Sequence, residues 1–208
     1  MSVPARLVLA STSRYRRELL ARMGLPVEAV APGVEEDLPP GLPVVRAAAL
    51  LAERKARAVA SRPEHVEDLV IGSDQICLGP DGRILSKPGT LDRAREQLGA
   101  LAGRAHRLVT AVAVMRADRL EVAVDVHTLN MWPLDADEID RYLAHDAPFD
   151  CAGSYRLEAL GLALFSRITA DPESADETAV IGLPVMKTLR ILRESFGWTP
   201  WPRPPSAP

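Results

Sequence analysis

The chain has 208 residues, of which 47% are hydrophobic and 25% charged, and its formal net charge is -3. This length and apolar content predict one compact domain with a sizeable core, and they give no indication of disorder. The acidic balance argues against a protein that lies along a nucleic-acid backbone, because such proteins need a broad basic surface.

Strand-like and helix-like stretches alternate along the chain, which favours an α/β or mixed architecture over a sandwich or a helix bundle. In chain order the pattern predicts a strand over 7–10, a helix over 16–23, a strand over 27–31, a helix over 44–60, a strand over 69–71, a hairpin of 76–78 with 84–85, a helix over 92–102, a hairpin of 106–115 with 120–129, a helix over 135–145, a strand over 161–168 and a helix over 185–196. The proline-rich residues 199–208 are expected to form a loose tail, which leaves residues 1–198 as a single domain.

The cysteines and the N-terminus bear on the cellular compartment. Cys77 and Cys151 stand far apart with no CxxC motif or Cys/His cluster, so they indicate neither a structural zinc site nor a disulfide framework. The N-terminus lacks the pattern of a signal peptide, and no apolar run is long enough to cross a bilayer. We therefore expect a soluble cytoplasmic protein with no membrane partner.

Hydroxyl and guanidinium side chains follow the first predicted strand directly, in the run Ser11-Thr12-Ser13-Arg14-Tyr15-Arg16-Arg17. A strand that passes into a helix N-terminus presents free backbone N–H groups, and with such side chains it can hold a phosphate. The same residues are also common at ordinary capped helix starts with solvated arginines. This segment alone leaves both interpretations open.

Carboxylates follow two of the predicted strands. Asp74 comes just after the apolar residues 69–71, where open α/β sheets place their ligands, although an Asx turn would explain it equally well. Glu35 and Glu36 follow the strand over 27–31, and paired acids of this kind suit a hard divalent cation. Acidic loop residues are usually only solvated, so this pair counts as a site only together with Asp74.

Two lysines and one histidine need separate interpretations. Lys55 lies in a helix beside other charged residues, where a solvated charged face is the default. Lys87 follows a predicted hairpin strand and precedes Pro88, so its ammonium is held in a rigid loop that can meet a phosphate. His106 begins a strand and is interpreted as a strand-end or core histidine outside the site.

Several short segments along the chain carry a combined signal. They are Leu9-Ala10-Ser11-Thr12-Ser13 followed by Arg16-Arg17-Glu18-Leu19-Leu20, Val34-Glu35-Glu36, Lys55-Ala56, Ile71-Gly72-Ser73-Asp74-Gln75, Lys87-Pro88, Cys151-Ala152-Gly153-Ser154-Tyr155 and Ile181-Gly182-Leu183-Pro184. Taken together, these segments resemble the Maf family of nucleoside triphosphate pyrophosphatases. They occur in the family's order and extend over residues 8–192, nearly the whole chain.

The resemblance implies an α/β fold in which helices flank a mixed central β-sheet and a deep nucleotide cleft separates two lobes. It implies hydrolysis of a nucleoside triphosphate to the monophosphate and pyrophosphate, with a divalent cation, Mg²⁺ or Mn²⁺, and it suggests a homodimer. Asp74 matches the family's catalytic proton acceptor, and Glu36 with Asp74 matches the metal site. The matches to the phosphate site are Ser11, Arg16, Lys55 and Lys87.

Within the family, base choice is associated with the positions of Tyr15, Gln75 and Glu158. An aromatic residue, glutamine and glutamate there resemble the branch that acts on 7-methyl-GTP, whereas the branch acting on thymidine and uridine triphosphates carries arginine, threonine and glutamine. An N7-methylated guanine is cationic, so an aromatic face contributes roughly 0.5–2 kcal/mol and a carboxylate adds an ion pair. The alternative for Glu158 is a surface carboxylate paired with Arg156.

Some residues depart from the family's pattern, and two other functions remain alternatives. Arg14 stands where the family usually has proline, and Tyr15 stands where tryptophan is expected. The alternatives are cleavage of thymidine or uridine triphosphate, and a nucleic-acid-binding inhibitor of septum formation. The inhibitor would need a basic, aromatic-bearing surface, whereas this chain is net acidic and only 4% aromatic.

Overall fold

The computed structural model describes residues 5–173 and 175–201, so part of the expected tail, residues 202–208, lies outside the described residues. Within these ranges the strands form one seven-stranded sheet in the order β2-β1-β3-β5-β6-β7, with β4 paired to β3. The strands are β1 Leu7–Ala10, β2 Val27–Val30, β3 Leu69–Leu78, β4 Ile84–Leu85, β5 Ala105–Arg116, β6 Arg119–Met131 and β7 Phe165–Ala170. The sheet is mixed, because β1 is parallel to β2 and β3 whereas the remaining pairs are antiparallel.

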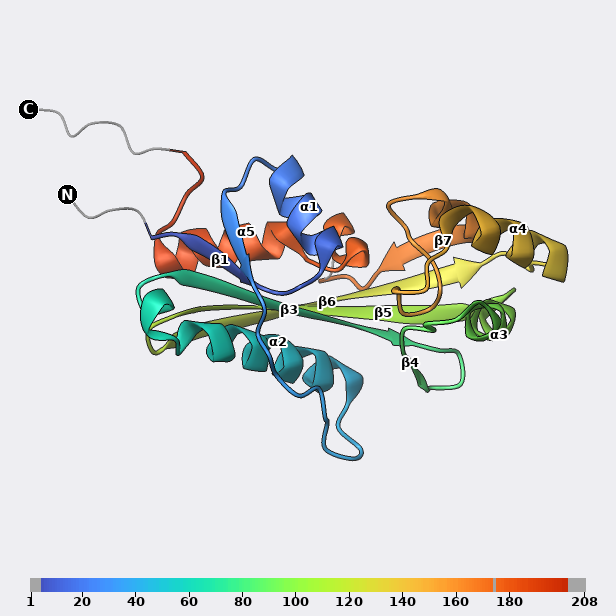
Figure 1. The fold of residues 1–208 in the computed structure, drawn as a ribbon, viewed down its shortest axis with the longest axis horizontal. Helices are drawn as coiled ribbons and strands as arrows, with labels where there is room; N and C mark the ends of the chain where they lie inside the picture. The colour runs from blue at the N-terminus through green and yellow to red at the C-terminus, as the bar shows by residue number, and fades with distance from the viewer. Residues whose placement is uncertain (1–4, 174, 202–208) are drawn as a thin grey trace, which may run out of the picture.

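Helices cover both faces of this sheet, as predicted. Figure 1 shows α2 on one face, α1 and α5 on the other, and α3 and α4 toward the far end of the long strands β5 and β6. The helices are α1 Arg14–Arg22, α2 Val44–Ala60, α3 Leu91–Leu101, α4 Ala136–Asp146 and α5 Val185–Phe196, with short 3-10 helices η1 Pro63–His65, η2 Leu160–Leu164 and η3 Glu177–Ile181. A separate hydrophobic cluster lies under α2, under α1 with α5, and under α3 with α4.

Strand β3 is much longer than the predicted strand over 69–71. Its parallel partner β1 pairs only as far as Gly72, but antiparallel pairing with β5 continues from Val70 to Leu78. Asp74 therefore lies in the middle of a strand, and the interpretation of this residue as an Asx turn after the strand is wrong. Among the described residues, the β1 side of β3 stays without a strand partner from Ser73 until β4 pairs at Cys77.

Alternation along β3 sends neighbouring side chains to opposite faces. Gly72 lies against the backbone of α2, and Asp74 bonds to Lys55 of the same helix. Ser73 and Gln75 instead reach carbonyls of the η3 segment and the residue after it. Residues 72–75 therefore present groups to both faces of the sheet, where β3 continues beyond the end of β1.

Several other predicted boundaries also differ from the structure, and two of these differences have a local cause. The strand expected over 161–168 begins only at Phe165, because Gly161 belongs to η2 and packs against Arg156, where an added Cβ would lie 2.3 Å from the carbonyl oxygen. Helix α1 begins at Arg14 rather than Arg16, because the Ser13 side chain caps it by accepting from the Arg16 backbone N–H at 3.4 Å.

The contact between β3 and α2 is close enough to predict the effect of one methyl group. A Cβ on Gly72 would lie 2.2 Å from the Ala52 carbonyl oxygen and 2.6 Å from the Ala56 backbone nitrogen. Gly72→Ala is expected to lower the free energy of unfolding by about 3 kcal/mol, measured by urea denaturation. Gly99→Ala in α3, where a Cβ meets nothing within 4 Å, is the control and should be slightly stabilising. A wild-type midpoint for Gly72→Ala would contradict this packing.

Candidate active site

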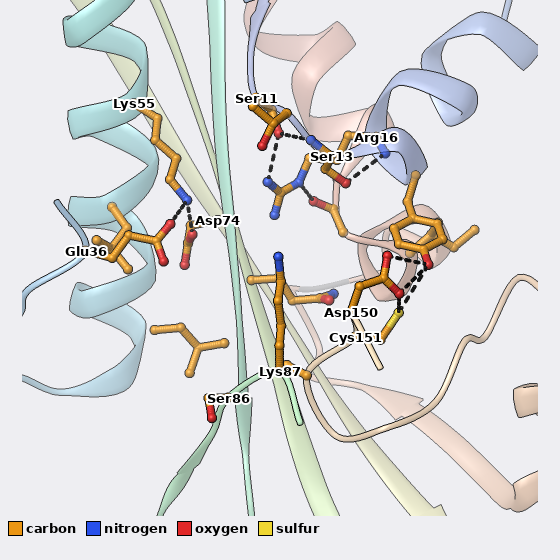
Figure 2. A pocket seen from close by; sticks show the side chains of 18 of the residues that line it. Ser11, Ser13, Arg16, Glu36, Lys55, Asp74, Ser86, Lys87, Asp150 and Cys151 are labelled. Atoms are coloured by element: carbon orange, nitrogen blue, oxygen red, sulfur yellow. Dashed lines mark hydrogen bonds and ion pairs between the residues drawn. The ribbon is translucent and has the colours of Figure 1, made fainter. Parts of the chain in front are cut away.

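A cavity of about 980 Å³ opens at the point where β1 ends and β3 continues (Figure 2). Its lining comes from the β1–α1 junction, the loop after β2, α2, β3, the loop after β4, the loop after α4 and the η3 segment. Every site residue predicted from the sequence lines this cavity, whereas Glu35 does not. These lining residues are Ser11, Tyr15, Arg16, Glu36, Lys55, Asp74, Gln75, Lys87 and Glu158.

Lys55 joins the two predicted metal-binding carboxylates. Its Nζ lies 2.6 Å from Asp74 Oδ1 and 2.6 Å from Glu36 Oε1. Lys55 and Asp74 are buried, with 8% and 7% of their surfaces exposed, whereas the Glu36 side chain is largely exposed. The expectation of a solvated charged face at Lys55 is wrong, because this residue shares the buried face of α2 with Leu51 and Val59.

The shared ammonium leaves the two carboxylates in different electrostatic states. Burial raises the pKa of Asp74, and the charges of Lys55 and Arg16 only partly oppose it. The hydrogen bond from Lys55 lowers the pKa of Glu36 and outweighs the effect of its partial burial. Carboxylates whose pKa values are pushed apart in this way suit different roles. Asp74 is the better proton acceptor, and Glu36 is the better permanent anion.

Arg16 is oriented by a backbone carbonyl and a serine hydroxyl. Its Nε donates to the Gly182 carbonyl oxygen at 2.7 Å and its Nη1 donates to Ser11 Oγ at 3.3 Å. The buried Ser73 hydroxyl lies 3.0 Å from the same Gly182 oxygen. The two interpretations of the opening segment therefore both hold in part: Ser13 caps the helix, while Ser11 and Arg16 line the cavity.

Sequence reasoning missed the part played by Gly182. This residue has φ +117°, and a Cβ there would lie 3.5 Å from Arg16 Nε. Its contribution to the site is a main-chain oxygen, which no side-chain pattern reveals. The Gly182-Leu183-Pro184 segment was one signal of this position, but only as part of the family resemblance.

Lys87 lies in the loop after β4 and reaches the cavity from the side opposite Ser11 and Arg16 (Figure 2). Lys87 is exposed to solvent. Its positive charge contributes to the lowered pKa of Glu36. Together with Arg16 and Lys55 it surrounds the part of the cavity next to Asp74 with cationic groups. Such convergence of cations suits a polyanionic ligand.

Tyr15, Gln75 and Glu158 line the cavity with a different chemistry. Gln75 donates its amide N–H groups to the Ala179 carbonyl at 2.9 Å and to Thr110 Oγ1 at 3.0 Å, which leaves its amide oxygen as the group to meet a ligand. Partial burial raises the pKa of the Glu158 carboxyl. Arg156 makes its ion pair with Asp146, at 3.7 Å, rather than with Glu158.

The donor set fits a divalent cation only together with a ligand. Among the described residues no group of three or more His, Cys, Asp or Glu side chains converges. Glu36 and Asp74 converge as a pair on Lys55, and Mg²⁺ is commonly held by one or two carboxylates plus substrate phosphates. The residues present therefore fit a cation that is completed by phosphate oxygens.

The remaining sequence expectations concern residues away from the chemistry. His106 is buried, with its Nε2 2.8 Å from the Tyr155 hydroxyl, and burial lowers its pKa to about 4, so it is a core histidine as predicted. Cys77 and Cys151 are both free thiols. No helix within residues 5–173 and 175–201 is long and apolar enough to span a membrane.

Comparison with known proteins places most of the chain in one family. The family model described as Maf-like protein matches residues 6–195. The chain is 45% identical over 191 residues to a 7-methyl-GTP pyrophosphatase from Xanthomonas campestris pv. campestris strain 8004, covering 91% of this chain and 96% of that protein. It is 43% identical to one from Bordetella pertussis strain Tohama I over 199 residues, covering 96% of both. One from Pseudomonas syringae pv. tomato is 42% identical over 188 residues, covering 89% of this chain and 94% of that protein. The chain therefore belongs to the Maf family.

Proposed function

We propose that this chain is a nucleotide pyrophosphatase that hydrolyses 7-methyl-GTP to 7-methyl-GMP and pyrophosphate. One observation carries the proposal: a cationic region around Asp74 and an aromatic, anionic region around Tyr15 and Glu158 line the same cavity. The first suits a triphosphate, and the second suits a cationic base. The names of relatives more than 40% identical over most of the chain support the same substrate.

The part of the cavity around Arg16, Lys87 and Asp74, the phosphate end, is the proposed site of the triphosphate. It supplies positioning and charge neutralisation, on which cleavage of a phosphoanhydride mainly depends. Arg16 is held by Gly182 and Ser11, so its guanidinium is oriented before the ligand arrives. Lys87 brings a second positive charge from the opposite side of the cavity. A divalent cation bound at Glu36 and Asp74 would supply further neutralisation of the phosphate oxygens.

Asp74 is the proposed general base. A water molecule attacks the α-phosphorus, its proton passes to the Asp74 carboxylate, and the bond from that phosphorus to the bridging oxygen breaks, so that pyrophosphate leaves with the bonding electrons. Burial raises the pKa of Asp74, which makes it a stronger acceptor than an exposed aspartate. Lys55, 2.6 Å away, fixes the position of the carboxylate.

The part of the cavity around Tyr15, Gln75 and Glu158, the base end, is the proposed site of the nucleobase. It supplies an aromatic ring face, a negative charge and hydrogen-bond acceptors. The Tyr15 ring can stack on a methylated, cationic purine, and the Glu158 carboxylate can pair with its charge. Guanine offers N–H donors on its pairing edge, which the Gln75 amide oxygen and the Glu158 carboxylate can accept. A neutral pyrimidine would leave these groups without equivalent partners, so the same residues disfavour it.

A competition assay tests the substrate. With equal concentrations of 7-methyl-GTP and thymidine triphosphate, we expect kcat/KM to favour the methylated nucleotide by more than about tenfold, measured from the two monophosphate products. Glu158→Gln, which keeps the size and removes the charge, should narrow that preference, whereas Glu35→Gln outside the cavity should not. Faster turnover of thymidine triphosphate would contradict the proposed substrate while leaving the reaction class intact.

A further inference from the structure

A cluster at the base end of the cavity ties the start of α1 to the loop after α4. The Tyr15 hydroxyl donates to Asp150 Oδ1 at 3.0 Å and accepts from Arg14 Nη2 at 2.7 Å. Arg14 and Asp150 also form an ion pair at 3.6 Å. All three residues line the cavity, and they come from segments about 135 positions apart in the chain.

This cluster restrains the Tyr15 ring. The hydroxyl is held from both sides, and the Arg14 guanidinium carbon lies 4.7 Å from the ring centroid, so one face of the ring is already occupied by a cation. A base that stacks on Tyr15 must therefore use the other face. The ring is positioned for that contact by Asp150, which is the acceptor of its only hydroxyl proton.

The charges of the cluster matter as much as its geometry. Hydrogen bonds from Tyr15 and Cys151, together with the charge of Arg14, outweigh the effect of partial burial and keep the pKa of Asp150 below its usual value, so this group is anionic at neutral pH. Burial raises the pKa of Tyr15, so the phenol stays a donor. Asp150 and Glu158 thus provide two carboxylates at the base end of the cavity, where Arg14 pairs with Asp150. Arg156 pairs with Asp146 and does not line the cavity, although its charge partly opposes the rise in the pKa of Glu158.

We infer that Asp150 is a further specificity-determining residue: it positions the Tyr15 ring through the phenol hydroxyl, and with Glu158 it makes the base end selective for a cationic over a neutral purine. This inference rests on the proposed function. It gives the Tyr15–Asp150 contact a role in recognition of the nucleobase, in addition to the roles of the residues matched to the family's specificity positions. Arg14, at a position where the family usually has proline, covers the face of the Tyr15 ring that the nucleobase does not use.

The test compares two nucleotides that differ by one methyl group and one charge, 7-methyl-GTP and GTP. Asp150→Asn keeps an acceptor for the Tyr15 hydroxyl and removes the charge, so it should lower the preference for 7-methyl-GTP by about two- to fivefold, in KM rather than in kcat. Tyr15→Phe removes the hydroxyl and keeps the ring. Asp140→Asn is the matched control, because Asp140 pairs with Arg95 on the exposed side of α4 and lies outside the cavity.

The double variant decides whether Asp150 acts through Tyr15. If it does, the effect of Asp150→Ala, which removes the acceptor as well as the charge, becomes smaller in the Tyr15→Phe background, because the hydroxyl through which Asp150 positions the ring is already absent. An unchanged nucleotide preference in Asp150→Asn, or fully additive effects in the double variant, would overturn the inference. A wild-type enzyme that does not prefer 7-methyl-GTP to GTP would instead contradict the proposed function, and the inference with it.

Discussion

Asp74→Asn is expected to lower kcat for 7-methyl-GTP by about a thousandfold, because asparagine has the size of aspartate but cannot accept a proton from the attacking water. Nucleotide binding should largely survive. The contacts that orient Arg16 do not involve the Asp74 side chain, and Lys87 approaches from another loop. The loss should therefore appear in kcat rather than in affinity.

Two measurements separate these effects. Pyrophosphate release gives kcat, and calorimetric titration with 7-methyl-GMP gives the affinity for the product. Asp118→Asn, in the exposed turn between β5 and β6, serves as the control and should behave like the wild type. An Asp74→Asn enzyme that retains more than about a tenth of wild-type kcat would remove Asp74 as the general base.

Lys55→Met is expected to lower kcat by about a hundredfold and to move the acidic limb of the pH profile to higher pH. Burial raises the pKa of Asp74, and Lys55 is the leading influence that opposes this rise. Without the ammonium the pKa of Asp74 rises further. The carboxyl then stays protonated, and inactive as a base, up to a higher pH than in the wild type.

The pH dependence of kcat/KM measures this coupling directly. Lys55→Arg keeps the positive charge and should leave the acidic limb closer to that of the wild type, even if its bulk lowers the rate. An acidic limb that does not move in Lys55→Met would mean that Lys55 does not tune Asp74. Lys55 would then contribute to the site only as a structural ion pair with Glu36 and Asp74.

Much of the fold could be predicted because hydrophobic periodicity reports which face of an element is buried. The helix Val44–Ala60 has the predicted bounds, and the two long hairpin strands were found in the right places, although both extend further than expected. The extent of β3 could not be predicted in the same way. Its polar residues Ser73, Asp74 and Gln75 interrupt the apolar pattern, yet pairing with β5 keeps them in the sheet.

The site shows the same limit at the level of single residues. Side-chain chemistry and family order identified a set of residues that the structure brings to one cavity. The charged residues near Lys55 in the chain favoured a solvated face, although the apolar residues one turn away, Leu51 and Val59, were a signal that it shares the buried face of the helix. Local sequence could not reveal the Gly182 carbonyl or the Asp150 contact, because they depend on segments brought together only by folding.

Product analysis of 7-methyl-GTP hydrolysis in water labelled with heavy oxygen tests the central claim most directly. With Mg²⁺ or Mn²⁺ present, attack on the α-phosphorus predicts unlabelled pyrophosphate and 7-methyl-GMP that carries the label. Formation of 7-methyl-GDP with orthophosphate would contradict the proposed cleavage, and label in the pyrophosphate would contradict the attack at the α-phosphorus. No release of pyrophosphate from any nucleotide, methylated or not, would contradict the enzymatic function itself.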